Sequence, residues 1–388
     1  MVKTSMDYLV EKTRNAENTV IFGAGKSGIY VRKILNKYNI HITAFCDNSE
    51  SLQGGKIGNL TIISVDDAIH QYPRAVFVVA NLHNGEEMIE ELENKGIEKQ
   101  KILCFYLSMI CDYYEQAEPY EYEEEIQERY YYQFHRKLDL KNPKTYNEKT
   151  TWDMLYNNDP IRTQLSDKYR VRQWIREKIG EKYLNQLYGC WENAGDIKFN
   201  ELPGQCVLKL NHGSGCNIII KDKNEINERE IVEKLEYWRH INFAYYSLEL
   251  QYRKIKPLII CEKYLENIND DLYDYKVYCF HGKPEYISFV RGRGEHTPSD
   301  AFFNTKWERQ PFHYKFHRKI EEDIPKPFQL EKMLELSRIL SESFKYVRVD
   351  WYILPAGKII FGEMTFSSFA GAVPWDPIEY DEILGKLI

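Results

Sequence analysis

Two carboxylates near the end of the chain have a spacing that suits a divalent cation. Residues 346–354 and 358–364 predict two β-strands. If residues 356–357 form a two-residue turn, Asp350 lies directly opposite Glu363, with Cβ atoms about 5 Å apart. Carboxylates that close repel each other unless a cation lies between them, and Mg²⁺ suits oxygen ligands that also meet phosphates. This spacing therefore predicts a magnesium site.

The same register places two more polar side chains beside these acids. It pairs Arg348 with Thr365 on the same face of the hairpin. Arg348 would then lie where a guanidinium can meet a phosphoryl group in transfer. The alternative is that Arg348 only neutralises the two acids within a structural network.

A loop rich in small residues could cover phosphates. Residues 206–210 and 218–221 predict two strands, and the loop between them contains Gly213, Ser214 and Gly215. Backbone N–H groups in such a loop can surround an anion. The pattern predicts a hairpin flap over phosphates.

Further charged residues lie on predicted strands. Lys209 stands in an otherwise apolar run, and a buried ammonium needs an anionic partner; the alternative is a surface lysine beside an ordinary turn. Period-two alternation puts Asp274 and Lys276 on one face of the next strand. The chain then returns toward Arg291 and Arg293.

An apolar strand at residues 258–265 ends in Glu-Lys-Tyr-Leu. Its last backbone groups could meet an adenine edge, with Tyr264 and Leu265 packing nearby.

The beginning of the chain carries a nucleotide-binding pattern. A short apolar strand at residues 19–22 leads into a GxGxxG turn formed by Gly23, Gly25 and Gly28, and a second strand ends at Asp47. The glycines let backbone N–H groups approach a phosphate at a helix N-terminus, and Asp47 could accept hydrogen bonds from a ribose. A P-loop is excluded, because Val20 stands where that motif needs glycine.

Strands and helices continue to alternate up to residue 105, which predicts a parallel sheet with helices on both faces. This segment resembles the Rossmann-like domain at the N-terminus of bacterial sugar-modifying enzymes, where the domain holds a nucleotide-sugar. The alternatives are a scaffold with an empty pocket and one that docks a partner. No hydride-transfer acid lies nearby to support a nicotinamide role.

Length and composition set the organisation. A chain of 388 residues predicts two domains. We expect residues 1–112 to form a nucleotide or nucleotide-sugar binding domain, residues 113–135 a helical linker rich in Glu and Tyr, and residues 136–388 the catalytic domain.

Charge and hydropathy exclude several classes of protein. A net charge of −7 argues against a general nucleic-acid binder. No apolar run is long enough for a membrane span, and residues 1–15 lack a secretion signal, so we expect a cytoplasmic protein. The eight cysteines show no CxxC spacing, which predicts reduced thiols and no zinc site.

Taken together, these motifs resemble the ATP-grasp fold and, more narrowly, its TupA-like branch, named for teichuronopeptide biosynthesis. The matching stretches are Ser166-Asp167-Lys168-Tyr169, VLKLNHGSGCN (207–217), ICEKYLE (260–266), DYKVYCFHGKP (274–284), FFNTKW (302–307), VRVDWY (347–352) and FGEMTFSSFAG (361–371). The expected fold class is α/β, with an N-terminal Rossmann-like parallel sheet followed by an α+β ATP-grasp domain.

The resemblance implies a role for each matching residue. Lys209, Lys276 and the Gly213–Gly215 flap would contact ATP phosphates. Adenine would lie against Glu262, Tyr264 and Leu265, and Asp270 would meet the ribose. Asp350 and Glu363 would bind Mg²⁺, and Arg348 would steady an acyl phosphate. Thr365 stands where many ATP-grasp enzymes have asparagine, which leaves the number of metal ions open.

The implied activity is an ATP-dependent ligase that forms an amide by way of an acyl phosphate. We expect a uronic acid, free or on a nucleotide-sugar such as UDP-glucuronate, to supply the carboxylate, and an amino acid or small amino alcohol to supply the amine, in capsular or surface polysaccharide biosynthesis. His212 could act on the amine or only order the flap. The alternatives are a glycosyltransferase with a nucleotide-sugar donor and a non-catalytic nucleotide-binding module of a capsule-assembly complex. Oligomeric state is left open.

Overall fold

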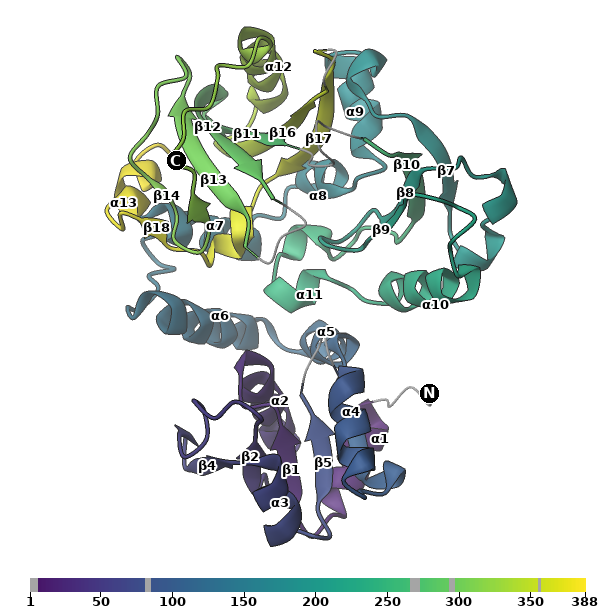
Figure 1. Cartoon of the computed structure of the whole chain (residues 1–388). Helices are drawn as coiled ribbons and strands as arrows, with labels where there is room; N and C mark the ends of the chain where they lie inside the picture. Colours follow the sequence, from purple (N-terminus) through teal and green to yellow (C-terminus); the bar gives the residue numbers. More distant parts are fainter. Residues whose placement is uncertain (1–5, 81–84, 266–272, 293–296, 355–356) are drawn as a thin grey trace. The chain divides into compact units, whose positions relative to one another are not determined.

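The computed structural model describes residues 6–80, 85–265, 273–292, 297–354 and 357–388. The chain divides into two compact units, Met1–Gln116 and Ala117–Ile388, each with its own core (Figure 1).

The first unit is a mostly parallel sheet with helices on its faces. Its strands lie in the order β3-β4-β2-β1-β5-β6, and only β3 runs antiparallel to its neighbour. Numbered along the chain, the five parallel strands lie in the order 3-2-1-4-5, which is typical of dinucleotide-binding domains. The elements are α1 (Met6–Arg14), β1 (Thr19–Phe22), α2 (Lys26–Lys37), β2 (Ala44–Cys46), β3 (Lys56–Ile57), β4 (Leu60–Ile63), α3 (Val65–Gln71), β5 (Val76–Val79), α4 (Gly85–Asn94), β6 (Ile102–Cys104) and α5 (Leu107–Gln116).

Helices α3 and α4 bury their apolar sides against one face of this sheet. Ala68 and Leu92 pack with Val20 and Phe77, which alternate with residues of the opposite face. The near-continuous apolar strands of the sequence are therefore explained by burial on both sides.

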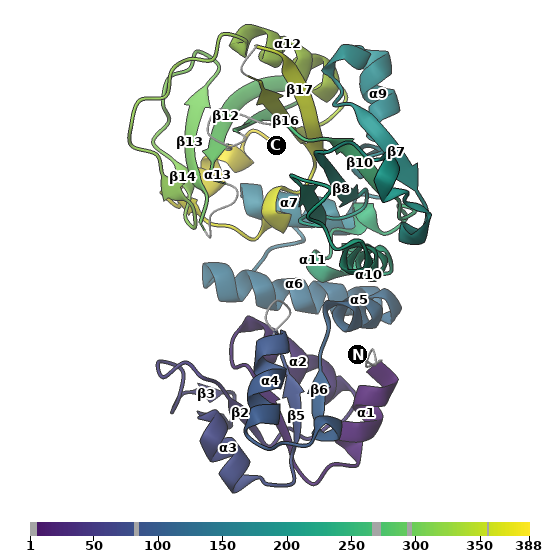
Figure 2. The ribbon, with the colours of Figure 1, turned by 45° about the vertical axis from the view of Figure 1, so that its right-hand side comes forward.

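The second unit begins with helices and holds three sheets. Four strands form one sheet in the order β7-β10-β8-β9, six form another in the order β15-β13-β12-β11-β16-β17, and β14 pairs with β18 in the third (Figures 1 and 2). The elements are α6 (Pro119–Phe134), α7 (Tyr146–Tyr156), α8 (Pro160–Ser166), α9 (Val171–Lys178), β7 (Leu187–Trp191), β8 (Cys206–Leu210), β9 (Asn217–Ile220), α10 (Glu228–Arg239), α11 (Ala244–Ser247), β10 (Ile259–Lys263), β11 (Asp274–Phe280), β12 (Lys283–Arg291), β13 (Ser299–Asn304), β14 (His313–Tyr314), β15 (Arg318–Lys319), α12 (Leu330–Ser341), β16 (Tyr346–Ile353), β17 (Ile359–Thr365), β18 (Trp375–Asp376) and α13 (Tyr380–Gly385).

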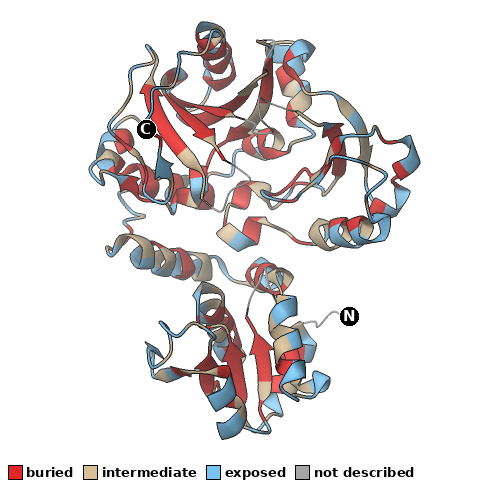
Figure 3. Cartoon of the chain, in the orientation of Figure 1, coloured by how far each residue is buried: buried red, intermediate tan, exposed pale blue. Residues whose placement is uncertain are grey.

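The six-stranded sheet has a different character on each face. Val277, Val349 and Trp351 point into a hydrophobic core that α12 covers, and the central strands are buried along their length (Figure 3). The opposite face carries a cluster of buried aromatic rings, which includes Tyr278 and Tyr346. Many of the chain's tyrosines therefore serve as packing surface. Charged residues share this second face, next to the aromatic cluster.

No helix among the described residues is both long enough and apolar enough to cross a membrane.

Candidate active site

The β16–β17 hairpin brings the predicted metal ligands together through a β-bulge. Near the turn, Trp351 pairs with Phe361, whereas Arg348 pairs with Thr365, so β17 has one extra residue between these two pairs. Asp350 lies at this irregularity and has no regular partner. The predicted Arg348–Thr365 pair is present, but the straight ladder that would oppose Asp350 to Glu363 is wrong. Of the two predicted turn residues, 356 lies outside the described residues, whereas the N–H of Gly357 donates to the carbonyl oxygen of Leu354 at 2.7 Å.

The bulge changes which side of β17 faces the core. Before the bulge, Ile359 and Phe361 point into the hydrophobic core, and after the bulge Met364 does so. Glu363 and Thr365 consequently turn toward the face that carries Arg348.

One nitrogen of Arg348 marks the point where three oxygens converge. Its Nη2 lies 2.7 Å from Asp350 Oδ2, 3.1 Å from Glu363 Oε1 and 3.0 Å from Thr365 Oγ1. Its Nε also donates to Asp350 Oδ1 at 2.7 Å. Burial alone would lower the pKa of this guanidinium, but the charges of Asp350 and Glu363 raise its pKa well above the ordinary value. Arg348 therefore stays cationic.

Lys276 adds a second cation from the neighbouring strand. It pairs with Asp350 across β11 and β16, and its Nζ lies 2.7 Å from Asp350 Oδ2 and 3.5 Å from Asp274 Oδ2. As the alternation predicts, Asp274 and Lys276 share one face of the strand. Both side chains are buried.

All of these groups except Asp350, which lies behind Arg348 and Lys276, line a cavity of about 570 Å³, which we call the polar pocket. Lys276, Arg348, Glu363 and Thr365 line it, and so do Gly213 and Ser214 of the β8–β9 loop, although Gly215 does not. The other lining residues include Lys168, His212, Glu249, Tyr252, Asp274, His317 and Phe369. The structure thus places the predicted flap beside the predicted metal ligands.

Lys168 is a pocket residue to which the sequence analysis gave no role. Its Nζ donates to the carbonyl oxygen of Gly213 at 2.6 Å, and burial lowers its pKa while Glu363 nearby opposes that shift. The signal was present in the Ser-Asp-Lys-Tyr stretch, but a lone lysine at a helix start has no distinctive spacing.

His212 orders the loop. Its Nε2 donates to the carbonyl oxygen of Ile241 at 3.0 Å, and its ring contacts Phe243. Burial lowers its pKa to about 4, so the imidazole is neutral at pH 7. This favours the structural alternative over a role as a proton acceptor.

Lys209 finds its anionic partner within the protein. Its Nζ lies 2.7 Å from Glu262 Oε2, and Arg172 reaches Glu262 Oε1 at 3.1 Å. Glu262 is buried, while Tyr264 and Leu265 directly after it are partly exposed at the end of β10. These three predicted adenine contacts are adjacent in the structure, and Asp270 lies outside the described residues.

Arg291 lies away from the polar pocket. Asp274 pairs with Val290, which lines the pocket, so alternation turns Arg291 to the other face of β12, where it forms an ion pair with Glu322. The structure therefore does not bring Arg291 together with Lys276 and Arg348 in the lining of the polar pocket. Arg293 lies outside the described residues.

The donor set fits Mg²⁺ in its chemistry. The described residues contain no group of three or more His, Cys, Asp or Glu side chains arranged around one point. Asp350, Glu363 and Thr365 instead offer two carboxylates and a hydroxyl around a position that a cationic nitrogen now holds. Mg²⁺ commonly takes one or two carboxylates and completes its shell with phosphates and water.

The glycine turn of the first unit joins β1 to the N-terminus of α2. A Cβ on Gly28 would lie 1.9 Å from the carbonyl oxygen of Gly23, whereas one on Gly25, at the N-cap of α2, would meet nothing within 4 Å. Both carboxylate oxygens of Asp47, the predicted ribose contact, accept backbone hydrogen bonds. Oδ2 accepts the N–H of Ala24 at 2.7 Å, and Oδ1 accepts that of Ser49 at 2.9 Å.

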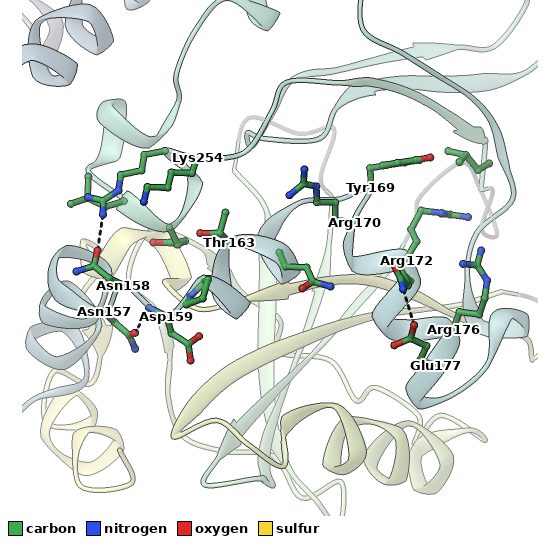
Figure 4. A pocket seen from close by; sticks show the side chains of 17 residues that line it. Asn157, Asn158, Asp159, Thr163, Tyr169, Arg170, Arg172, Arg176, Glu177 and Lys254 are labelled. Carbon is green, nitrogen blue, oxygen red and sulfur yellow. Dashed lines mark hydrogen bonds between the residues drawn. The ribbon is translucent and has the colours of Figure 1, made fainter.

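A second cavity of the second unit, about 900 Å³, is basic, and we call it the basic groove (Figure 4). Arg170, Arg172 and Arg176 line one part of it, and Lys254 lies at the other end. With Arg253 there are five basic side chains against two acidic ones. The short 3₁₀ helix Leu250–Tyr252 lines both cavities, because Leu250 faces the groove and Tyr252 faces the polar pocket.

Several solved structures resemble the chain at low identity. D-alanine–D-alanine ligase from Bacillus anthracis complexed with ATP is 13% identical, with 95% of this chain and 94% of that chain covered and a TM-score of 0.35. L-amino acid ligase from Bacillus licheniformis is 11% identical, with 89% and 67% covered and a TM-score of 0.36. UDP-D-quinovosamine 4-dehydrogenase from Vibrio fischeri is 19% identical over 23% of this chain and 78% of that chain, with a TM-score of 0.20.

Matches to protein families are more decisive. No curated protein matches the chain. Residues 15–103 match the C2185-like, N-terminal family. Residues 148–388, more than half of the chain, match the TupA-like ATPgrasp family, which confirms the resemblance and the fold class predicted from the sequence. The chain belongs to the TupA-like ATPgrasp family.

Proposed function

We propose that the protein is an ATP- and Mg²⁺-dependent ligase that activates a carboxylate as an acyl phosphate and joins it to an amine. The observation that carries this proposal is the convergence of Asp350, Glu363 and Thr365 on one cationic nitrogen inside the polar pocket. Membership in the ATP-grasp superfamily supports the use of ATP.

The chain's own residues would position the reactants. Mg²⁺ held by Asp350, Glu363 and Thr365 would neutralise phosphate charge. Lys168 and Lys276, together with the N–H groups of the β8–β9 loop, would hold the phosphates, and Arg348 would stabilise the charge on the phosphoryl group as the substrate carboxylate attacks it. Adenine would lie at the end of β10, beside the Lys209–Glu262 ion pair.

We further propose an acidic sugar as the carboxylate substrate, a uronate or a nucleotide-sugar such as UDP-glucuronate, in the assembly of a surface polysaccharide. Two features support this choice. The basic groove shares the 3₁₀ helix Leu250–Tyr252 with the polar pocket, so an anionic chain could lie there. The glycine turn of the first unit suits a nucleotide diphosphate.

Acid-dependent release of ADP tests the activity. The protein is incubated with ATP, Mg²⁺, glucuronate or UDP-glucuronate, and ethanolamine or L-alanine. We expect ADP, phosphate and an amide in equal amounts. Asp350→Asn and Glu363→Gln should each lower the rate at least about 100-fold, while Asp323→Asn, at an exposed acid of the same unit, should leave it unchanged.

Other outcomes would identify the alternatives. UDP release without ATP that survives Asp350→Asn would indicate a glycosyltransferase. Binding of ATP with no turnover for any pair of acid and amine would indicate a non-catalytic module. Either result would contradict the ligase proposal.

A further inference from the structure

One histidine in the lining of the polar pocket, His317, is paired with a buried carboxylate, that of Asp300. His317 Nδ1 lies 3.1 Å from Asp300 Oδ2, and His317 belongs to the lining of the pocket. Asp300, on β13, is completely buried, and its Oδ1 has no hydrogen-bond partner among the described residues. A buried carboxylate is costly unless it serves a cationic or polar partner, and here that partner is the imidazole.

The pair fixes the state of the histidine ring. Asp300 accepts the Nδ1–H, so in the neutral imidazole Nε2 carries the lone pair. The ring is held by edge contacts with Tyr314 and Phe369, each with centroids 5.6 Å apart, and Phe369 also lines the pocket. Within the described parts of the chain no partner is found for Nε2. His317 is thus an oriented base at the wall of the pocket.

The other titratable groups of the pocket are less suited to accept a proton. The pKa of His212 is lowered to about 4 by burial, so it is a weak base. Glu249 accepts from Ser247 and Ser367, Asp274 lies 3.5 Å from Lys276 Nζ, and Glu363 is held by Arg348. Lys168 and Lys276 are engaged with Gly213 and Asp350.

We propose that His317 is the general base for the amine substrate and that Asp300 is its positioning residue. This inference rests on the proposed ligase function. An alkyl amine arrives as an ammonium ion and cannot attack until it loses a proton. Nε2 takes that proton, and the freed electron pair forms the C–N bond to the acyl phosphate.

As the C–N bond forms, the C–O bond to phosphate breaks and its electron pair leaves on the phosphate. The second proton of the nitrogen goes to that phosphate, and the imidazolium returns its proton to water. The products are the amide, inorganic phosphate and one proton.

A comparison of two nucleophiles separates this role from a structural one. Hydroxylamine is unprotonated at neutral pH and traps acyl phosphates without a base, whereas ethanolamine is an ammonium ion. With UDP-glucuronate or glucuronate and ATP, we expect His317→Gln to lower ethanolamine-dependent ADP release about 100-fold and hydroxylamine-dependent release less than about 3-fold. Asp300→Asn should show the same pattern to a smaller extent and serves as the second variant if His317→Gln does not fold.

His240→Gln is the matched control, because His240 also lies beside a carboxylate, that of Glu236, but is exposed and does not line the pocket. It should leave both rates unchanged. An equal loss with both nucleophiles, or no loss with ethanolamine, would overturn the role of His317. Absence of acid-dependent ADP release from the unaltered protein with either nucleophile would instead overturn the ligase function, and this inference with it.

Discussion

At the scale of single residues, Arg348 is the unusual group. An Nη2 nitrogen carries two hydrogens, yet three oxygens lie within hydrogen-bond distance of it. At any moment at least one of these three oxygens lacks a full hydrogen bond from Nη2, so its lone pair can bind a second cation. Only arginine can also grip Asp350 through two parallel bonds.

Arg348→Lys should keep the charge and lose this two-pronged grip. We expect ADP release to fall at least about 100-fold, because a lysine cannot hold Asp350 and meet a phosphoryl group at once. Arg338→Lys, at an exposed position of α12, is the control. Near-normal activity of Arg348→Lys would show that only the charge matters.

His212 gives the second unit a specific dependence on pH. Its pKa is about 4 in the folded protein and 6.5 when unfolded, so between these values the unfolded chain holds a proton that the folded chain does not. Stability should therefore fall as pH falls, by about 2 kcal/mol between pH 7 and pH 5 from this residue alone.

Urea unfolding followed by tryptophan fluorescence measures this effect. All seven tryptophans lie after residue 150, so the signal reports the second unit alone. His212→Asn should be less stable at pH 7 but should show a flatter pH dependence. Equal slopes in both proteins would contradict the assignment.

At the scale of elements, two glycines of the β1–α2 turn have different structural roles. Gly28 allows close packing between α2 and the turn, and Gly25 leaves open space at the helix N-terminus. We expect Gly28→Ala to destabilise the first unit by about 1–3 kcal/mol. Gly25→Ala should fold normally and weaken only the binding of UDP-glucuronate.

Hydrogen exchange of the peptides that cover β1 and α2, together with calorimetry of UDP-glucuronate, would check this pair. Faster exchange in Gly28→Ala alone is the expected result. Unchanged affinity in Gly25→Ala would argue that the first unit is a scaffold.

The basic groove gives a third element-scale prediction. Arg172 and Arg176 are one turn apart on α9, and Arg170 precedes them. We expect Arg170→Gln with Arg176→Gln to weaken binding of oligogalacturonate about 3- to 10-fold, less so at high salt. Glu233→Gln with Arg229→Gln on α10 is a control with exposed charges elsewhere. If the affinity of the groove variant for oligogalacturonate is unchanged, the basic groove does not bind the substrate.

Much of this architecture follows from sequence patterns, and the exceptions have physical causes. Glycine spacing and apolar runs predict β1, α2, β5 and the β8–β9 hairpin, because these depend on local chemistry. The helical linker expected over residues 113–135 is instead formed by the end of α5 and by α6, which are separated before Pro119. The strand expected to end at Asp47 is only three residues long, Ala44–Cys46.

The site was predictable where neighbours in sequence are neighbours in space. Lys276 and Asp274 follow from alternation, and Arg348 with Thr365 from counting across a hairpin. Lys209 and Glu262 come from different strands, and Asp300 and His317 from segments seventeen residues apart, so only the fold shows that each pair meets. Counting residues outward from the turn assumes a straight ladder, so it cannot place the extra residue of β17.

At the scale of the whole molecule, the cysteines test the reduced state predicted from the sequence. All eight are free, and six are buried, leaving Cys104 and Cys190 partly exposed. Titration with a thiol reagent should find eight thiols in urea and at most two that react quickly in the folded protein. Fewer than eight in urea would reveal a disulfide.

The bulge in β17 also has a consequence for how this protein can change. The inserted residue reverses the alternation of side chains along β17. Ile359 and Phe361, at odd positions, face the hydrophobic core before the bulge, and Met364, at an even position, faces it after the bulge. Deleting Gly362 would remove the extra residue and leave a straight ladder, in which Phe361, Met364 and Thr365 keep their partners and Glu363 faces Asp350 directly. Loss of a single codon there should therefore leave the hydrophobic core intact and alter turnover, because it moves only the Glu363 carboxylate.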